Sequence, residues 1–478
     1  MMTEATEVEA LAVDLDGTLI RSDLLYESFW AALAGNFATP MVALRGLAGG
    51  RAQLKQRLAA LSTLDVALLP YDAQVIERVK AYRARGIRTI LVTASDRSLA
   101  QRVADHLGIF DEVHGSDGRT NLKGKTKAAF LEQRYGNAGY AYIGDHKADM
   151  PVWATAGHVI AVVPSGALRA RIQRTYPHAE IIDRPGFAAR AYMKALRPHQ
   201  WLKNALIFLP MLAAHRFDQP AILASLLAFI SFSLLASSVY VLNDLLDLAA
   251  DRIHPRKRNR PFASGSIPIA HGTVMALALI GAGFGLSLLL GLPFIATIAA
   301  YFVLTTGYSL VLKRRAIVDI CALAMLYVMR IIAGGAATGI PLSVWLLAFA
   351  LFFFFALAAI KRQGELVDAA ASGRLKAHGR GYFAPDVEIV SQFATASGYV
   401  SIMVLALYVN SREVSALYLH PEALWGICLI LLYWISRLVM ITHRGHMHDD
   451  PIVYATKDKN SYVCGVLVVA FAVGGALL

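Results

Sequence analysis

Cysteine is scarce in this chain, which holds three thiols in 478 residues. Cys321, Cys428 and Cys464 all lie in apolar stretches, and none of them forms a CxxC pair. This pattern argues against a disulfide framework and against a zinc site. We therefore expect these side chains to behave as small buried hydrophobes.

Charge is also scarce, because charged residues make up 17% of the chain. Acidic residues number 34 against 46 Lys and Arg, which gives a formal net charge of +12. A basic protein can bind nucleic acid, but here the Lys and Arg residues gather between long apolar segments. Loops that set membrane topology and groups that bind phosphate explain this distribution better, so we expect no nucleic-acid partner.

Composition divides the chain into two domains. Residues 8–185 carry charges throughout, with strand-like runs at Ala10–Val13 and Thr89–Val92, which predicts a soluble α/β domain. Residues 186–200 read as a linker, and residues 201–478 as an all-α membrane bundle of about nine spans. The apolar windows lie near 201–214, 222–242, 271–290, 293–312, 317–339, 342–360, 393–411, 422–442 and 461–478.

The distribution of basic loops predicts the orientation of this bundle. Loops on the N-terminal domain's side hold 16 Lys and Arg residues, and the opposite loops hold only Arg216 and Arg412. Basic loops stay in the cytoplasm. The N-terminus is acidic and shows no signal-peptide pattern. We expect a multi-pass inner-membrane protein whose N-terminal domain and polar clusters are cytoplasmic.

The most informative polar cluster is Asn243, Asp244, Asp247 and Asp251 at the end of an apolar segment. Spacings of three and four residues place the aspartates on one helix face. Clustered carboxylates near a membrane repel one another unless a cation binds them. The sequence therefore predicts a Mg²⁺ site, which suits a phosphorylated substrate.

Other candidate substrate-binding residues gather on the same predicted face. Arg330 is different, because it lies within an apolar segment and should face the bundle interior, although pairing with a structural carboxylate is an alternative. The remaining candidates are Lys203, Asn204, Arg256, Lys257, Arg260, Tyr308, Lys313, Asp319, Lys361, Arg362, Glu365 and Arg444.

The motifs RPxQWxKN, NDLLDxxxDRxHPxKRxRP, YSxxLKxxxxxD and RGxMxDDP occur in this order. Over residues 195–478 the chain thereby resembles the UbiA-type intramembrane prenyltransferase superfamily, whose aspartate motifs hold Mg²⁺ and a diphosphate. Members that prenylate aromatic rings carry a second aspartate motif after the sixth span, where this chain has Lys361-Arg362-Gln363-Gly364-Glu365. It is more similar to the decaprenyl-phosphate phosphoribosyltransferase branch.

That resemblance implies transfer of 5-phosphoribose from phosphoribosyl diphosphate (PRPP) to a polyprenyl phosphate. Asp244 and Asp247 would be catalytic, and with Asp251 they would bind Mg²⁺. Lys203, Lys313 or Arg362 would draw in the lipid phosphate. The candidates for holding the 5-phosphate are Arg256, Lys257, Arg260 and Arg444, and the sequence does not divide them among the three phosphate groups.

The first domain contains DxDGT at Asp14–Thr18, a strand ending at Thr93, a lysine-rich helix start at 123–127, and GDxxxD at 144–149. These pieces resemble the haloacid dehalogenase (HAD) phosphatases, which implies a Rossmann-like α/β fold with a helical cap over residues 21–85.

The same resemblance implies the site residues of this domain. Asp14 would be the nucleophile and Asp16 the general acid and base. Thr93 and Lys127 would hold the phosphoryl group, with Lys123 and Lys125 as rivals for the lysine role. A second Mg²⁺ would bind at Asp14, Asp16, Asp145 and Asp149.

Together these features predict a membrane transferase with a fused phosphatase that dephosphorylates its product. Two alternatives stay open. One is an aromatic prenyltransferase that uses a polyprenyl diphosphate, with an independent or regulatory HAD domain. The other is a transporter or a membrane anchor for the phosphatase, although transport needs polar groups at mid-membrane.

Overall fold

The computed structural model describes residues 8–117, 121–163, 166–184, 186, 189–373, 375, 380–411, 414, 417–447 and 450–477. The chain forms two compact units. The first contains Met1–Arg197 together with Tyr240–Leu277, and the second contains Pro198–Val239 and Ala278–Leu478.

The first unit contains a six-stranded parallel sheet in the order β3-β2-β1-β4-β5-β6. The chain order reverses between β1 and β4, and parallel sheets of this kind bind ligands beyond the carboxyl ends of the strands at that point. This sheet confirms the expected α/β domain. Its strands are β1 (Ala10–Val13), β2 (Arg88–Asp96), β3 (Glu112–Ser116), β4 (Tyr140–Gly144), β5 (His158–Val163) and β6 (Glu180–Asp183).

Helices cover both faces of this sheet. Alternate residues of β1 point to opposite faces, so that Leu11 and Val13 pack with one core cluster and Ala10 and Ala12 with the other. The helices and helical turns of this part are α1 (Leu24–Gly35), α2 (Thr39–Ala48), α3 (Arg51–Leu61), η1 (Val66–Leu68), α4 (Ala73–Ala84), α5 (Arg97–Leu107), α6 (Lys125–Tyr135), η2 (Lys147–Asp149), α7 (Met150–Trp153), α8 (Ala167–Thr175) and α9 (Ala189–Leu196).

The helical insert after β1 is shorter than the expected cap over residues 21–85. Helix α4 carries Val75, Val79 and Tyr82 into the same core cluster as Leu11 and Val13 of β1, so it belongs to the sheet's helical layer. The insert proper comprises α1 to η1. Helix α1 begins where the Asp23 side chain accepts a hydrogen bond from the Leu25 N–H at 2.8 Å, which caps the helix.

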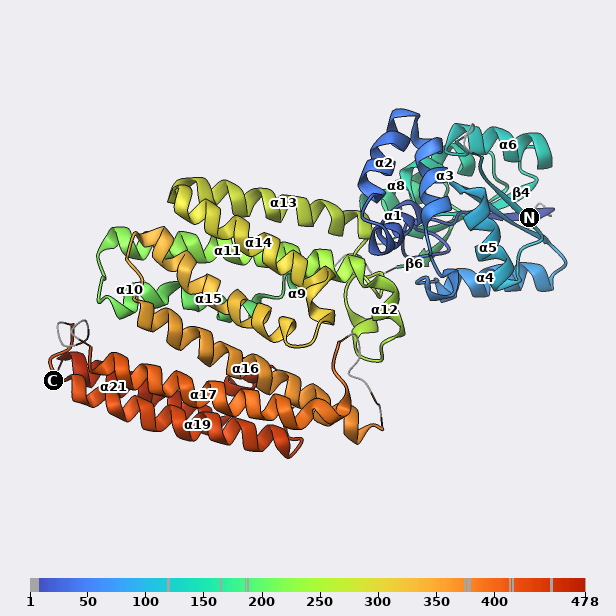
Figure 1. Cartoon of the computed structure of the whole chain (residues 1–478). Helices are drawn as coiled ribbons and strands as arrows, with labels where there is room; N and C mark the ends of the chain where they lie inside the picture. The colour runs from blue at the N-terminus through green and yellow to red at the C-terminus, as the bar shows by residue number, and fades with distance from the viewer. Residues whose placement is uncertain are drawn as a thin grey trace. The chain divides into compact units, whose positions relative to one another are not determined.

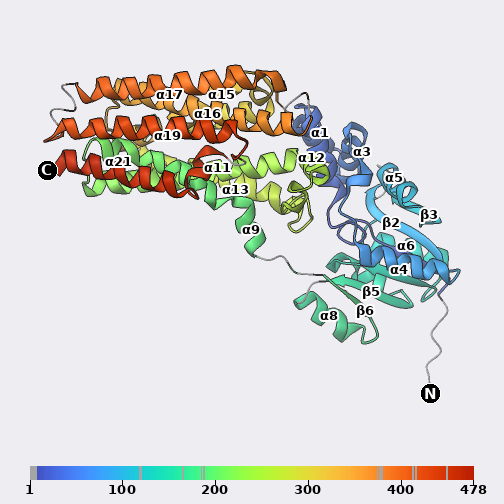
Figure 2. The ribbon, with the colours of Figure 1, turned by 90° about the horizontal axis from the view of Figure 1, so that it is seen from below.

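Eight helices of the described residues are long and apolar enough to cross a membrane, in agreement with eight of the expected windows. Figures 1 and 2 show the long helices of the second unit, among them α17, α19 and α21, running side by side. The helices are α11 (Gln219–Leu246), α13 (Ile269–Ser287), α14 (Leu292–Leu310), α15 (Val318–Thr338), α16 (Val344–Ala371), α17 (Val387–Val409), α19 (Trp425–His443) and α21 (Lys459–Leu477).

The expected first span, 201–214, is not a continuous α-helix. It consists of the 3₁₀ helix η3 (Pro198–Phe208) followed by the short helix α10 (Leu209–Ala213). Pro210 supplies no backbone N–H to an α-helical ladder, which favours the break. At about 2 Å per 3₁₀ residue and 1.5 Å per α residue, the two elements still extend roughly 30 Å, close to the thickness of the bilayer core.

Shorter elements join the spans. Helix α12 (Leu248–Ile253) and the turn η4 (Lys257–Asn259) follow α11, and η5 (Leu288–Leu290) follows α13. The turns η6 (Leu312–Arg314), η7 (Ala384–Asp386) and η8 (Pro421–Leu424) precede α15, α17 and α19, and α20 (Pro451–Ala455) precedes α21.

Candidate functional site

Three carboxylates converge where β1 and β4 end. One ligand oxygen from each of Asp14, Asp145 and Asp149 lies within 4.8 Å of the others, the one such group of three among the residues that the structure describes. Gly17 makes this approach possible, because a Cβ there would stand 2.3 Å from Oδ2 of Asp145. Gly17 also has a φ of +76°, a conformation that favours glycine.

Electrostatics favour a cation at this cluster. Burial, followed by the charges of Asp14 and Asp149, raises the pKa of Asp145 well above its usual range. Burial also raises the pKa of Asp14, with Lys127 opposing the shift and Asp149 adding to it. A divalent ion would relieve both the desolvation and the repulsion. Three convergent carboxylates are the oxygen donors that Mg²⁺ prefers, so these residues fit that ion.

Lys127 is the lysine that the structure brings to the cluster. Its Nζ lies 2.8 Å from Oδ1 of Asp14 and donates to the Tyr142 hydroxyl at 2.9 Å. Tyr142 in turn donates to Oδ1 of Asp149 at 2.9 Å, so the lysine is oriented from two sides. The rival candidates Lys123 and Lys125 are both exposed.

Asp16 lies outside the group of three carboxylates. Its Oδ2 accepts from the Ser95 hydroxyl at 2.5 Å and from the Thr93 hydroxyl at 3.4 Å, and its Oδ1 accepts from the Leu24 N–H at 2.8 Å. Burial, with the charge of Asp23, raises the pKa of Asp16 to about 7. A carboxyl group that titrates near neutrality suits general acid and base work, whereas its role as a metal ligand stays a prediction.

Two residues at this site carry no signal in the sequence motifs. Lys55 of α3 donates from Nζ to the Ala94 carbonyl at 2.6 Å. Burial lowers the pKa of Lys55, and the charges of Asp16 and Asp23 act against that shift. Arg184 donates to the carbonyls of Gly17 and Thr18, which ties the DxDGT turn to the far end of the domain. Only the cationic side-chain type could have suggested either residue.

The aspartate motif of the membrane part is held by arginines. Asp244 lies 2.5 Å from Arg197 and 3.0 Å from Arg260, and Asp251 lies 2.6 Å from the same Arg260 nitrogen. The helix breaks at Asp247, which stands between α11 and α12 as the N-cap residue of α12. Asp244, Asp247 and Asp251 do not form a group as tight as that at Asp14, so their Mg²⁺ site stays a prediction.

The other residues of this loop differ in exposure. Asn243 is half-buried, and its carbonyl accepts the Asp247 N–H at 2.9 Å. Arg256 and Lys257 are exposed, as a cation for a soluble phosphate would need to be. Arg260 instead is engaged by two aspartates.

In the second unit, Lys203 and Lys361 converge on one carboxylate. Their Nζ atoms lie 3.1 and 2.9 Å from Oδ2 of Asp450, which precedes α20. Burial disfavours the charged carboxylate, yet the two lysines outweigh it and hold the pKa of Asp450 far below its usual range. Among the described residues, two cations share one anion here, which leaves an excess of positive charge on this group of three. Residues 448 and 449 of the RGxMxDDP motif lie outside the described residues.

Arg362 is neutralised within the protein. It lies 2.6 Å from Oδ2 of Asp319, forms an ion pair with Glu365, and donates to the Tyr308 hydroxyl at 3.0 Å. Arg380 lies within 4.0 Å of both acids. This network brings four of the expected substrate-binding residues together, and both terminal nitrogens of the Arg362 guanidinium donate hydrogen bonds within it.

Arg330 is buried inside the bundle, as expected. Its Nε donates to Oδ1 of Asn204 at 2.9 Å, and its guanidinium lies 5.3–5.4 Å from three aromatic ring centres. In the part of the chain that the structure describes, Arg330 forms no ion pair with a carboxylate. The rings belong to Phe232, Tyr301 and Tyr327.

Two further candidates lie at helix ends. Lys313 is half-buried on η6, and Arg444 is exposed directly after α19. Their phosphate-binding roles stay predictions.

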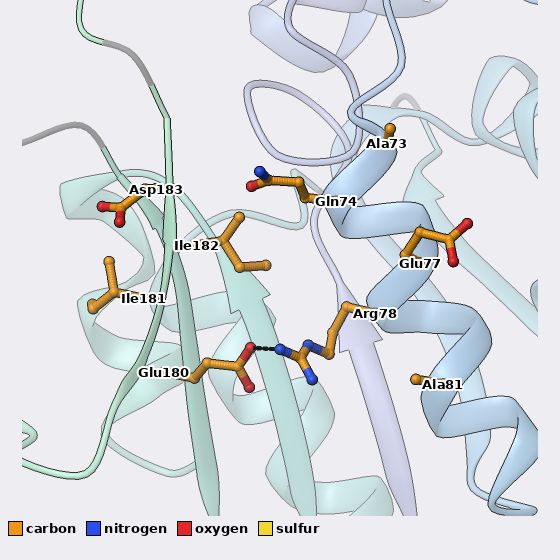
Figure 3. A pocket seen from close by; sticks show the side chains of 9 residues that line it. All are labelled: Ala73, Gln74, Glu77, Arg78, Ala81, Glu180, Ile181, Ile182 and Asp183. Atoms are coloured by element: carbon orange, nitrogen blue, oxygen red, sulfur yellow. Dashed lines mark ion pairs between the residues drawn. The ribbon is translucent and has the colours of Figure 1, made fainter.

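A hollow of about 580 Å³ lies between α4 and β6, and an ion pair between Arg78 and Glu180 crosses it (Figure 3). None of the expected catalytic residues lines it. We therefore place the chemistry at the carboxyl ends of β1 and β4.

Two family models match the chain. The UbiA prenyltransferase family matches residues 205–450, and the haloacid dehalogenase-like hydrolases match residues 11–153. An uncharacterized protein, y4nM, of Sinorhizobium fredii is 35% identical over 96% of this chain and 89% of its own length. The nodulation protein NoeC of Azorhizobium caulinodans is 38% identical over 57% of this chain and 89% of its own length.

The similar proteins with a named activity include decaprenyl-phosphate phosphoribosyltransferases. The decaprenyl-phosphate phosphoribosyltransferase of Corynebacterium glutamicum is 39% identical over 188 residues. The match covers 38% of this chain and 57% of that protein.

Proposed function

Because this chain belongs to the UbiA prenyltransferase family and carries a haloacid dehalogenase-like domain at its N-terminal end, we propose that it joins two steps of phosphate chemistry. The membrane domain transfers a 5-phosphoribosyl group from PRPP to a polyprenyl phosphate. The HAD domain then hydrolyses the 5-phosphate of the lipid-linked product.

The observation that carries the transferase assignment is the pair Lys203 and Lys361 on one carboxylate. An aromatic acceptor brings no phosphate of its own, whereas a polyprenyl phosphate brings a dianion that cations must hold. Lysines that outnumber their carboxylate supply that charge. The similarity to a decaprenyl-phosphate phosphoribosyltransferase supports the same substrate pair.

Asp244, Asp247 and Asp251 would hold the Mg²⁺ ion that neutralises the diphosphate as it leaves C1 of the ribose. The exposed Arg256, Lys257 and Arg444 are available to the 5-phosphate. Because Arg362 is already neutralised by Asp319 and Glu365, we assign it to holding α15 and α16 together, not to binding substrate.

In the HAD domain, a carboxylate oxygen of Asp14 attacks phosphorus and the bond to the 5-oxygen breaks. Lys127 and Thr93 hold the phosphoryl oxygens, while Mg²⁺ at Asp14, Asp145 and Asp149 would screen the two anions. Asp16 gives its proton to the departing alkoxide. It then takes a proton from the water that cleaves the aspartyl phosphate, which releases inorganic phosphate and restores Asp14.

Long apolar helices make this an integral membrane protein, and the loop charges favour a cytoplasmic N-terminal domain. PRPP is a soluble, highly charged molecule, so a cytoplasmic face for both sites is consistent with the proposed reaction.

The purified full chain, given ribose-labelled PRPP and polyprenyl phosphate, tests the proposal. We expect label in the lipid phase, diphosphate from the first step and inorganic phosphate from the second. Asp244→Asn should lower label transfer by about 10²-fold, in line with the loss of one charge-stabilising group. Asp218→Asn, at an exposed ion pair before α11, is the matched control and should transfer normally.

Asp14→Asn should stop phosphate release while the lipid product still accumulates with its 5-phosphate. Unchanged phosphate release in that variant would exclude the phosphatase assignment. Prenylation of an aromatic acid by a polyprenyl diphosphate, with no use of PRPP, would instead establish the aromatic prenyltransferase.

A further inference from the structure

A buried ion pair joins the HAD insert to the loop that follows the aspartate motif. In the first unit, the guanidinium of Arg252 donates to both carboxylate oxygens of Glu27, at 2.6 and 3.1 Å. The Arg252 side chain is 7% exposed and that of Glu27 is 1% exposed. The Ser22 hydroxyl also donates to this carboxylate, at 2.6 Å, so three hydrogen bonds hold the Glu27 side chain in one orientation.

Each partner of this pair stands beside a residue of a proposed active site. Glu27 lies in the first turn of α1, and the Leu24 N–H at the start of that helix donates to Asp16. Arg252 directly follows Asp251 in the six-residue helix α12. Asp251 binds Arg260, which also binds Asp244. One short helix therefore carries a contact of the HAD insert and a carboxylate of the transferase motif on consecutive residues.

Further contacts attach the same two segments. The Trp30 indole N–H of α1 donates to the Thr273 hydroxyl of α13 at 3.0 Å, and Trp30 is buried. At Gly265, a Cβ would stand 2.8 Å from Cβ of Arg21, so the chain after η4 lies directly against the start of the insert. The Arg252 Nε also donates to the Ala263 carbonyl, which links α12 to this stretch.

A buried ion pair contributes little net free energy to folding. Removing two charges from water costs about as much as their attraction returns, whereas the fork geometry of arginine fixes orientation well. Helix α12 is too short to be stable by itself and depends on its contacts for its position. The pair with Glu27 is one of the buried contacts that orient it.

We propose that Glu27 is a positioning residue for the transferase: through Arg252 it holds α12, and with it Asp251, in the place where the aspartate motif would bind Mg²⁺. The HAD insert then completes the membrane enzyme and does more than supply a second activity. This inference rests on the proposed transferase function. It assigns to α1 a role that is separate from the chemistry at Asp14.

The test compares Glu27→Gln and Arg252→Met with the wild-type full chain in lipid. The Mg²⁺ concentration for half-maximal phosphoribosyl transfer should rise about tenfold in both variants. It should rise less in Arg252→Lys, which keeps the charge and loses the fork. Hydrolysis of p-nitrophenyl phosphate should stay within about twofold of wild type. The matched controls are Glu132→Gln on the exposed side of α6 and Arg258→Met on η4, which should behave as wild type in both assays.

Hydrogen exchange of the segment 244–253 supplies a readout that does not depend on the substrate. We expect Mg²⁺ to protect this segment in the wild type, with the protection shifted to higher Mg²⁺ in Glu27→Gln. Absence of phosphoribosyl transfer by the wild type would remove the proposed function, yet this shift would still demonstrate the positioning role.

A wild-type Mg²⁺ requirement in folded Glu27→Gln, for transfer and for exchange protection, would overturn the inference. If Glu27→Gln does not fold, Arg252→Lys provides the decisive comparison, because it keeps a positive charge beside Glu27 and loses the two-pronged hydrogen bonding of the guanidinium. An unshifted Mg²⁺ requirement in Arg252→Lys would then count against the inference, and a shifted one would support it.

Discussion

Lys55 is a residue of the candidate phosphatase site that the sequence motifs do not indicate. It comes from the insert, not from the sheet, and its charge lies near Asp16 and Asp23. The positive charge of Lys55 would attract a phosphate monoester dianion to this site. We therefore assign Lys55 to substrate attraction, a role that depends on the insert being closed over the sheet.

Lys55→Met should lower kcat/KM for a phosphate monoester by about tenfold, mainly through KM, because a binding charge is lost and the reacting groups remain. Steady-state kinetics of phosphate release measure this effect. Lys80→Met on α4, an exposed lysine, is the control and should leave both constants unchanged. An effect on kcat alone would contradict the assignment.

Asp72 links acid stability to the catalytic turn. It pairs with Arg184 at 2.9 Å and with Arg21 at 3.1 Å. Burial opposes the shift, but these arginines lower the pKa of Asp72. A lowered folded-state pKa contributes stability that is present above the unfolded pKa and is lost as pH falls through the folded pKa.

Asp72→Asn should thus destabilise the domain at neutral pH by about 2 kcal/mol, with the difference shrinking below about pH 4. Asparagine remains a good N-cap for α4, so the variant keeps the cap of the helix and removes only the negative charge. Urea unfolding of the full chain in detergent at several pH values measures the difference. A constant difference between pH 7 and pH 3 would show that the charge is not its cause.

Among the elements, the tight turn after β1 has no room for a side chain at Gly17. Gly17→Ala would place a Cβ against the Asp145 carboxylate in a backbone conformation that alanine adopts at a cost. We expect loss of Mg²⁺-dependent phosphate release together with about 1–2 kcal/mol of destabilisation.

The matched control is Gly86→Ala. Gly86 has a φ of +78° and no heavy atom within 4 Å of an added Cβ, so it carries the same backbone strain without the collision. Gly86→Ala should lose similar stability and keep its phosphatase activity. Equal loss of activity in both variants would assign the effect to folding and not to the metal site.

Elements with a periodic or motif-bound signal were predictable from sequence. Eight spans follow from long apolar runs, because inside a bilayer the backbone must satisfy its own hydrogen bonds, and strands β1, β2 and β4 of the HAD domain precede recognisable motifs. The 3₁₀ course of η3 and the packing of α4 against the sheet depend on tertiary contacts, which no local pattern encodes.

The site was predictable at the level of residue types and less so at the level of partners. Asp14, Asp145 and Asp149 converge because parallel strands end at one edge. In contrast, the pairing of Arg362 with Asp319 spans 43 positions along the chain, and Arg184 contacts Gly17 across 167. Whether an arginine meets substrate or an internal acid is decided by such long-range contacts.

At the scale of the whole molecule, Mg²⁺ should stabilise the full chain. Added Mg²⁺ relieves repulsion at Asp14, Asp145 and Asp149 in the folded state only, so it shifts unfolding by mass action, by about 2.7 kcal/mol at a concentration of 100 Kd. Thermal unfolding in detergent with and without EDTA measures the shift. Asp149→Asn should reduce it, and a full shift in that variant would place the stabilising ion elsewhere.

The adjacent positions of Asp251 and Arg252 in α12 constrain how such a protein can evolve. Asp251 belongs to the proposed transferase site, and its neighbour Arg252 forms an ion pair with Glu27 of the HAD insert. A recombination event that replaced the N-terminal domain with a different phosphatase would bring no glutamate to meet Arg252. On our proposal the descendant would lose transfer along with its old phosphatase, so selection would act on the two activities as one inherited trait.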